Sequence, residues 1–307
     1  MSLIKNGDHV LVCRGKKHRW LIRMQTGKEF HSNFGIIKHD DMIGSEFGST
    51  YRSPSSELEF VLLKPLLHEL ATTLARKTQI VYPKDIGFII IKCGIRPHSR
   101  VLEAGTGSGS MTMMLSSIVN QYSGGKIISY DIEVKHHRIA TNNLEKAGLL
   151  KNADLRVGSI FQKDIQTLLK DDEYFDACFF DLPSPWDIIE FAHQVLQPCG
   201  VFCSFSPVIE QVKKTVSALK SGKWYDVEVL DLQARRWQVQ ENATRPVSHG
   251  RHTGYLVFAR KIIAEAPMEW NRKSRKRLRN KLENEGKIPK EIKEGSMELF
   301  NIGPSGD

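Results

Sequence analysis

The sequence has few cysteines and no long apolar run, and both absences narrow the class of protein. Five cysteines occur in 307 residues, most of them inside apolar stretches. This usage is typical of reduced, intracellular core thiols and argues against a disulfide framework. No run of about 18 apolar residues is present, as a transmembrane helix would need. The five are Cys13, Cys93, Cys178, Cys199 and Cys203, and we expect most of them in the core.

Signals for targeting or metal binding are also lacking. The N-terminal segment MSLIKNGDHVLV has neither the apolar core of a signal peptide nor the Arg- and Ser-rich pattern of a transit peptide. Cys199 and Cys203 have no second pair of ligands nearby in the sequence, so we expect no metal site. The adjacent histidines His136 and His137 likewise have no further ligands nearby. We therefore interpret them as surface histidines and not as metal ligands.

Basic charge is present in excess. The formal net charge is +9, which favours a polyanionic partner such as a nucleic acid. The segment NRKSRKRLRNK, residues 271–281, holds seven basic residues and no acid. Contact with phosphate, a nuclear-import address and a solvated helix are three compatible interpretations of this segment.

The pattern of apolar residues divides the chain into three parts. Short apolar runs such as DHVLVC, RWLIRM, GIIKH and LEFVLL predict β-strands over residues 1–63, with GSTYRSPSSE as a loop. From about residue 85, strands alternate with helices, which predicts an α/β fold with a mostly parallel, doubly wound sheet closed by an antiparallel edge. We therefore expect a β domain over 1–63, an α/β domain over 64–262 and a basic tail over 263–307.

The stretch VLEAGTGSGSM predicts a strand, a glycine-rich turn and a helix in that order. Gly105, Gly107 and Gly109 would let a ligand approach the backbone closely, and Asp131 at the end of the next strand would accept ribose hydroxyls. A dinucleotide fingerprint requires a third glycine where this chain has Ser110. The spacing instead matches class I S-adenosylmethionine-dependent methyltransferases; a purely structural glycine turn is the alternative.

The stretch ACFFDLPSPW places a carboxylate, Asp181, at the end of a buried strand. In a doubly wound sheet this end faces the ligand, and Pro183 and Pro185 restrict the loop that follows. A turn initiated by Asp before Pro is the structural alternative. For Trp186, core packing under the loop is favoured over stacking on a substrate base.

These two stretches occur together with RKTQIVYPKD, IGSEFGS, FCSFSPVIEQV and HTGYLVFAR, in order along the chain. The combination resembles the catalytic subunit of tRNA (adenine-58-N1)-methyltransferases, eukaryotic type, over about residues 5–262. The resemblance implies a class I, Rossmann-like methyltransferase domain with a small N-terminal β domain. It also implies tRNA as the substrate and S-adenosyl-L-methionine as the methyl donor.

The resemblance implies specific site residues. Asp181 would be catalytic, and Gln79 and Tyr82 would bind the substrate. The chain departs from the family where it has His136 in place of an arginine, Ser159 in place of an acid, and Leu-Leu-His-Glu-Leu at 66–70. The donor would be bound by Val81, Gly105, Gly107, Ser108, Gly109, Ser110, Asp131, His136, Ser159, Ile160 and Asp181.

The resemblance also implies an assembly. Eukaryotic members pair with a related, non-catalytic tRNA-binding subunit, which predicts a heterotetramer and no membrane partner; prokaryotic relatives are homotetramers. We expect a nuclear location, with the cytoplasm as the alternative. Two other functions stay open on the sequence alone: a class I methyltransferase acting on a protein or small molecule, and a non-catalytic tRNA-binding subunit.

Overall fold

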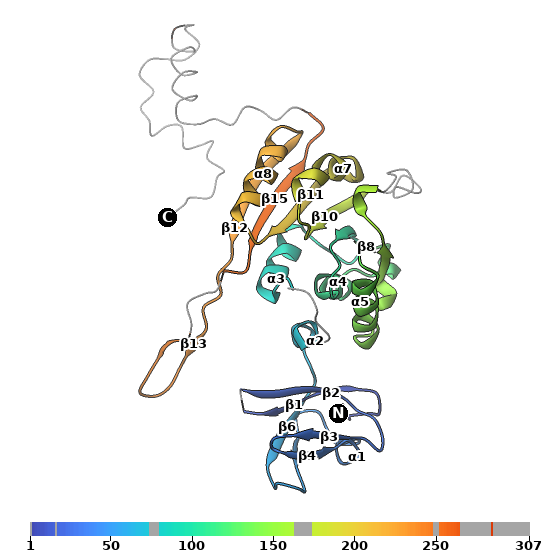
Figure 1. The fold of residues 1–307 in the computed structure, drawn as a ribbon, viewed down its shortest axis with the longest axis vertical. Coiled ribbons are helices and arrows are strands. Elements are labelled where there is room, and N and C mark those ends of the chain that lie inside the picture. Colours follow the sequence, from blue (N-terminus) through green and yellow to red (C-terminus); the bar gives the residue numbers. More distant parts are fainter. Residues whose placement is uncertain are drawn as a thin grey trace. The chain divides into compact units, whose positions relative to one another are not determined.

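The computed structural model describes residues 2–15, 17–73, 80–162, 174–247, 252–264 and 284 (Figure 1). The chain divides into one unit of residues 1–263 and another of residues 264–307. Every helix and strand given below lies in the first unit. Across the described ranges, no helix is both long and apolar enough to cross a membrane.

The N-terminal part forms an antiparallel sheet of four strands in the order β2-β1-β6-β5. Alternate residues of the central strands, such as Val10, Val12, Phe60 and Leu62, are fully buried and form one core. The four strand predictions for this region are confirmed. The elements are β1 (His9–Arg14), β2 (His18–Arg23), β3 (Glu29–Ser32), β4 (Gly35–Lys38), α1 (His39–Met42), β5 (Thr50–Arg52) and β6 (Glu59–Leu63).

The loop prediction for GSTYRSPSSE, residues 48–57, is wrong at residues 50–52, because β5 forms there and pairs with β6. Tyr51 is buried between exposed neighbours, and its hydroxyl donates to Asp41 Oδ2 at 3.3 Å while accepting from the Lys38 amide at 3.2 Å. A strand of three residues flanked by Ser, Gly and Pro leaves no periodic signal in the sequence. Tertiary pairing with β6 therefore decided this element.

The second sheet has seven strands in the order β12-β15-β11-β10-β7-β8-β9 (Figure 1). The pairs from β11 to β9 are parallel, whereas β15 is antiparallel to both β11 and β12. This topology confirms the predicted α/β fold and its antiparallel edge. The strands are β7 (Arg100–Ala104), β8 (Lys126–Asp131), β9 (Ala153–Val157), β10 (Phe175–Phe180), β11 (Leu196–Ser206), β12 (Trp224–Asp231) and β15 (Tyr255–Lys261).

Helices cover both faces of this sheet. Successive residues of a central strand enter different cores: Val101 belongs to one cluster and Leu102 to the other, as expected for a strand buried on both faces. The first cluster gathers α3, α4 and α5, and the second α7 and α8. The helices are α2 (Leu67–Thr73), α3 (Pro83–Lys92), α4 (Ser110–Ser116), α5 (Val134–Lys146), α7 (Ile189–Val195) and α8 (Ile209–Lys220), with single turns at Gln121–Ser123, Leu150–Asn152, Ile160–Gln162 and Pro185–Ile188.

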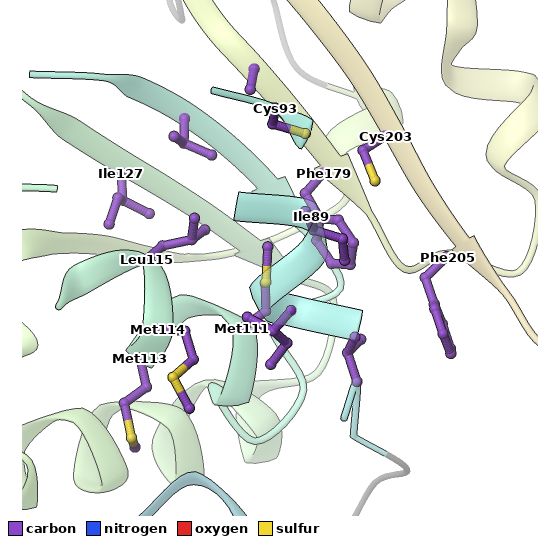
Figure 2. Packing of buried hydrophobic residues seen from close by; sticks show 14 of the residues in the cluster. Ile89, Cys93, Met111, Met113, Met114, Leu115, Ile127, Phe179, Cys203 and Phe205 are labelled. Carbon is purple, nitrogen blue, oxygen red and sulfur yellow. The ribbon is translucent and has the colours of Figure 1, made fainter. Parts of the chain in front are cut away.

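Figure 2 shows the first cluster, in which side chains of α3, α4, β8, β10 and β11 converge. Met111, Met113 and Met114 of α4 are all buried there, which confirms that these methionines are core residues. Four of the five cysteines are buried as expected. Cys199 is the exception: it is exposed and has a positive φ of 66° within β11, next to Gly200.

A short ribbon between β12 and β15 was not anticipated. Its strands are β13 (Trp237–Gln238) and β14 (Arg245–Pro246), which pair antiparallel. Each strand has two residues, and the side chain of Trp237 is 56 % exposed. Neither alternation nor a core-facing stripe exists over so few residues, and hence no sequence pattern marks the ribbon.

Candidate active site

The order in which the chain adds strands to the sheet reverses between the parallel neighbours β7 and β10. From β7 the chain proceeds to β8 and β9 on one side, and β10 and β11 follow on the other. Ligands of open α/β sheets bind at such a switch point, outside the carboxyl ends of the strands. Gly105 follows β7 and Asp181 follows β10, and the Asp181 amide donates to Ala104 O at 3.0 Å. The two predicted site segments therefore meet at the switch point.

A pocket opens at this position, and we call it the switch-point pocket. It collects residues from the segment before α3, from the glycine loop, and from the ends of β8 and β10. Eight of the residues predicted for donor binding line it. Its lining consists of Ile80, Val81, Gly105, Thr106, Gly107, Ser108, Ser110, Met111, Asp131, His136, Phe179 and Asp181.

Four predicted residues lie outside this lining, and one is outside the described part of the chain. A Cβ on Gly109 would lie 2.8 Å from Leu144 Cδ1, so this glycine allows α5 to pack closely. Tyr82 is 37 % exposed directly before α3. Ser159 is half-buried and Ile160 belongs to the core on the other face. Gln79 is the residue outside the described ranges.

Asp131 makes more hydrogen bonds than the other acid of the pocket, Asp181. Its Oδ2 accepts from the Gly107 amide at 2.8 Å, and its Oδ1 accepts from the Glu133 amide at 2.9 Å. His136 Nδ1 lies 3.2 Å from Oδ1, so the residue that replaces the expected arginine orients this carboxylate. A carboxylate can accept about four hydrogen bonds. Asp131 is thus fixed in place, and one acceptor position, on Oδ2, is left for a ligand hydroxyl.

Asp181 differs from Asp131 in its surroundings. Burial raises the pKa of the Asp181 carboxyl from its ordinary value of 3.8 to about 6. A desolvated carboxylate gains most from a positive charge placed beside it, because little solvent screens the attraction. The geometry therefore suits a ligand or reaction centre that carries positive charge.

Glu103 was not predicted as a site residue, although it lies two residues before Gly105 in the stretch VLEAGTGSGSM. It is fully buried at the end of β7, and Thr112 Oγ1 of α4 donates to its Oε2 at 2.6 Å. Burial, with smaller contributions from the charges of Asp181 and Asp131, raises its pKa to about 7. Glu103 therefore connects β7 to α4 behind the glycine loop. Of the lining residues missed by the sequence, Thr106 lies in the recognisable loop, whereas Ile80, Met111 and Phe179 look like core.

Two further predictions can be placed. Trp186 does not line the pocket; it packs against the second core, and Lys214 Nζ lies 4.5 Å from its ring centroid. This confirms the core-packing interpretation. Within the residues that the structure describes, no cluster of three or more His, Cys, Asp or Glu side chains is arranged to hold a metal ion.

The strand order and the position of the pocket define a class I, Rossmann-like methyltransferase. The chain belongs to the family described as the tRNA methyltransferase complex GCD14 subunit, whose model matches residues 60–251. Residues 3–50 match a second model, described as TrmI-like N-terminal.

Characterised relatives and solved structures are similar over most of the chain. The TrmI tRNA (adenine(57)-N(1)/adenine(58)-N(1))-methyltransferase of Methanocaldococcus jannaschii is 34% identical over 80% of this chain and 92% of its own. The tRNA (adenine(58)-N(1))-methyltransferase catalytic subunit TRM61 of Candida albicans is 31% identical over 96% and 88%. The crystal structure of the tRNA (m1A58) methyltransferase TrmI from Aquifex aeolicus gives a TM-score of 0.71 at 28% identity, covering 86% of this chain and 100% of that one. A SAM-dependent O-methyltransferase from Thermotoga maritima gives 0.79 at 28% identity, covering 86% and 97%.

Proposed function

We propose that this chain is the catalytic subunit of a tRNA methyltransferase that transfers a methyl group from S-adenosylmethionine to N1 of adenine 58. The observation that carries the proposal is the meeting of Gly105 and Asp181 at the switch point of a family member. The relatives from Methanocaldococcus jannaschii and Candida albicans are named for this activity. A non-catalytic role has no support from a pocket that retains both acids and the glycine loop.

The pocket lining suits S-adenosylmethionine. The free acceptor position of Asp131 supports a hydrogen bond from a ribose hydroxyl, and Gly105 and Gly107 support close approach of the donor to the backbone. Ser110 Oγ is buried, and no hydrogen-bond partner for it is found among the described residues, so a polar ligand atom would satisfy it. Val81 supplies an apolar wall. When bound, the donor supplies an electrophilic methyl group on a sulfonium centre.

The chemistry at the acceptor explains the need for Asp181. Adenine N1 has a free lone pair, so no proton must be removed before the N1–methyl bond forms and the sulfur–methyl bond breaks. The product base carries a positive charge. The Asp181 carboxylate accepts a hydrogen bond from the exocyclic amine and stabilises that charge as it develops, an effect of about 3–4 kcal/mol per preorganised group.

Access to the target base involves the residues just before α3. The base lies inside folded tRNA and must leave its stack to reach the pocket. Tyr82 is exposed beside the lining residue Val81, which supports packing of its ring against the extruded base, and Gln79 precedes it in the sequence. Both are proposed here as substrate-binding residues.

We further propose that the chain works with a related, non-catalytic tRNA-binding subunit in a heterotetramer. The family description and the name of the Candida albicans relative both refer to a subunit, which supports this assembly. We propose a nuclear location on the basis of the basic segment 271–281, which lies outside the described residues. Light scattering of the chain with and without co-expressed partner tests the first proposal, and imaging of a fluorescent fusion tests the second.

Mass analysis of nucleosides tests the proposed activity. The protein is incubated with tRNA and donor, with and without co-expressed partner subunit, and the tRNA is digested. We expect 1-methyladenosine, abolished by Asp181→Ala. Parallel incubation of bulk protein with labelled donor detects the alternative acceptors. Label in protein and none in tRNA would contradict the proposal.

A further inference from the structure

Lys84, Asp85 and Thr253 form a closed polar network at the beginning of α3. Lys84 Nζ donates to Asp85 Oδ1, to Thr253 Oγ1 and to the backbone oxygen of Leu232, each at 2.7 Å. Thr253 Oγ1 in turn donates to Asp85 Oδ2 at 2.9 Å. All three ammonium donors are engaged, and both oxygens of the Asp85 carboxylate accept.

This network is buried at Asp85 and half-buried at Lys84 and Thr253. The Asp85 side chain is fully inaccessible, and that of Lys84 is 21 % exposed. A buried charge pair that is completely hydrogen-bonded holds its members in one arrangement, because any departure leaves a desolvated group without its partner. The network is therefore a rigid connection between its three parts of the chain, although Lys84 and Thr253 are 169 residues apart.

The network also continues to the wall of the switch-point pocket. The amides of Asp85 and Ile86 donate to Tyr82 O at 2.9 and 3.0 Å, which fixes the first turn of α3. Tyr82 adjoins Val81, which lines the pocket and is buried in the first core. A short path of contacts thus leads from Thr253, before β15, to the residues proposed to face donor and base.

Apolar contacts hold the middle and end of α3. Phe88 contacts Phe258 of β15 edge to face, with ring centroids 6.0 Å apart. Ile89 and Cys93 lie in the same cluster (Figure 2). These contacts secure the middle and end of the helix. Ile86, buried in the same cluster, anchors the first turn together with the polar network.

We propose that Lys84, Asp85 and Thr253 are positioning residues, which set the place of Ile80, Val81 and Tyr82 against the switch-point pocket. The inference rests on the proposed function for the identity of the ligand. Its geometric part, that the network orders the first turn of α3, does not depend on any ligand. None of the three side chains lines the pocket, so their effect on the ligand is indirect.

The test compares Thr253→Val, which removes the hydroxyl at nearly constant shape, with Thr253→Ser, which retains it. Thr215→Val is the matched control, because Thr215 is buried in α8 and its hydroxyl donates to Gln211 O at 2.9 Å. Hydrogen exchange of the Asp85 and Ile86 amides reports order in the first turn. Calorimetry with S-adenosylhomocysteine, the demethylated donor, reports the pocket.

We expect Thr253→Val to accelerate exchange at these amides and to weaken binding of S-adenosylhomocysteine about three- to tenfold, the scale of one lost hydrogen bond. Thr253→Ser should restore both, and Thr215→Val should change neither despite a similar fall in the thermal midpoint. Unchanged exchange and affinity in Thr253→Val would overturn the inference. A different outcome would contradict the proposed function instead: Thr253→Val exchanges these amides faster than wild type, but the wild-type chain binds no S-adenosylhomocysteine. Lys84→Met repeats the exchange measurement from the other side of the network.

Discussion

A Cβ atom placed on Gly105 would lie 2.2 Å from the carbonyl oxygen of Asp181. The glycine at the end of β7 and the acid at the end of β10 are thus in backbone contact. Gly105 also has a φ of 93°, a conformation that L-residues rarely adopt. The absence of a side chain at Gly105 is therefore what allows the Asp181 backbone its present position.

We expect Gly105→Ala to reduce stability and to displace Asp181. The positive φ costs about 1–2 kcal/mol, and the steric clash adds about 1–3 kcal/mol. Gly124→Ala is the matched control, since Gly124 has a φ of 80° with no atom near its Cβ position. Urea unfolding of both variants isolates the clash. If both variants lost the same stability, the clash between the new Cβ and the Asp181 backbone would contribute nothing to the free energy of unfolding.

Asp181→Ala should reduce methyl transfer at least about a hundredfold, the effect of losing one preorganised charge. Donor affinity should change much less, because Asp131 and the glycine loop stay in place. Single-turnover rates and calorimetry with S-adenosylhomocysteine separate the two effects. Asp187→Ala, on the surface of the following turn, is the control. Near-normal turnover of Asp181→Ala would remove the carboxylate from its catalytic role.

The raised pKa of Asp181 predicts opposite pH trends for activity and stability. Methyl transfer requires the carboxylate, so its rate should rise with pH through about 6 and then level off. The folded chain binds this proton more tightly than the unfolded chain, whose carboxyl has the ordinary pKa of 3.8. The free energy of unfolding contributed by Asp181 therefore decreases as pH rises from about 4 to about 6. Urea unfolding across this pH range measures the effect, and Asp181→Asn should lack it. If the free energy of unfolding changed with pH equally in Asp181→Asn and in wild type, the raised pKa would not belong to Asp181.

Asp131→Ala should primarily weaken donor binding. The ribose loses a charge-assisted acceptor, which costs about 1.5–3 kcal/mol, and the Gly107 amide loses its partner. Calorimetry with S-adenosylhomocysteine measures the change. Asp154→Ala, on the neighbouring strand and paired with Arg156, serves as control. An unchanged dissociation constant for Asp131→Ala would place the ribose elsewhere.

Deletion of residues 265–307 should weaken tRNA binding without changing which adenine is methylated. If the basic segment 271–281 contacts phosphate, each lost contact lowers the slope of log affinity against log salt by about 0.7–0.9. Residues 264–307 belong to a separate unit of the chain, so residues 1–263 should still fold. Binding of the truncated complex between low and physiological salt measures the slope. An identical slope would assign the segment another role.

The sequence by itself determined the elements whose information is local. The glycine loop, Asp131 and Asp181 could be placed at strand ends because apolar periodicity, turn chemistry and strand length are written in short stretches of chain. A doubly wound sheet then brings carboxyl ends of parallel strands to one edge, so their meeting followed from topology. The resemblance added the identity of the ligand, because a pattern of apolar residues does not say which ligand binds.

Only the tertiary structure decided what depends on contacts between distant segments. The backbone contact of Gly105 with Asp181, the hold of His136 on Asp131, and the network from Lys84 to Thr253 exist because strand order and helix packing bring these groups together. The ionisation of Asp181 likewise follows from burial, which a sequence does not state. A turn or a strand is encoded by its own residues, whereas desolvation and long-range hydrogen bonds arise from the packing of the whole chain.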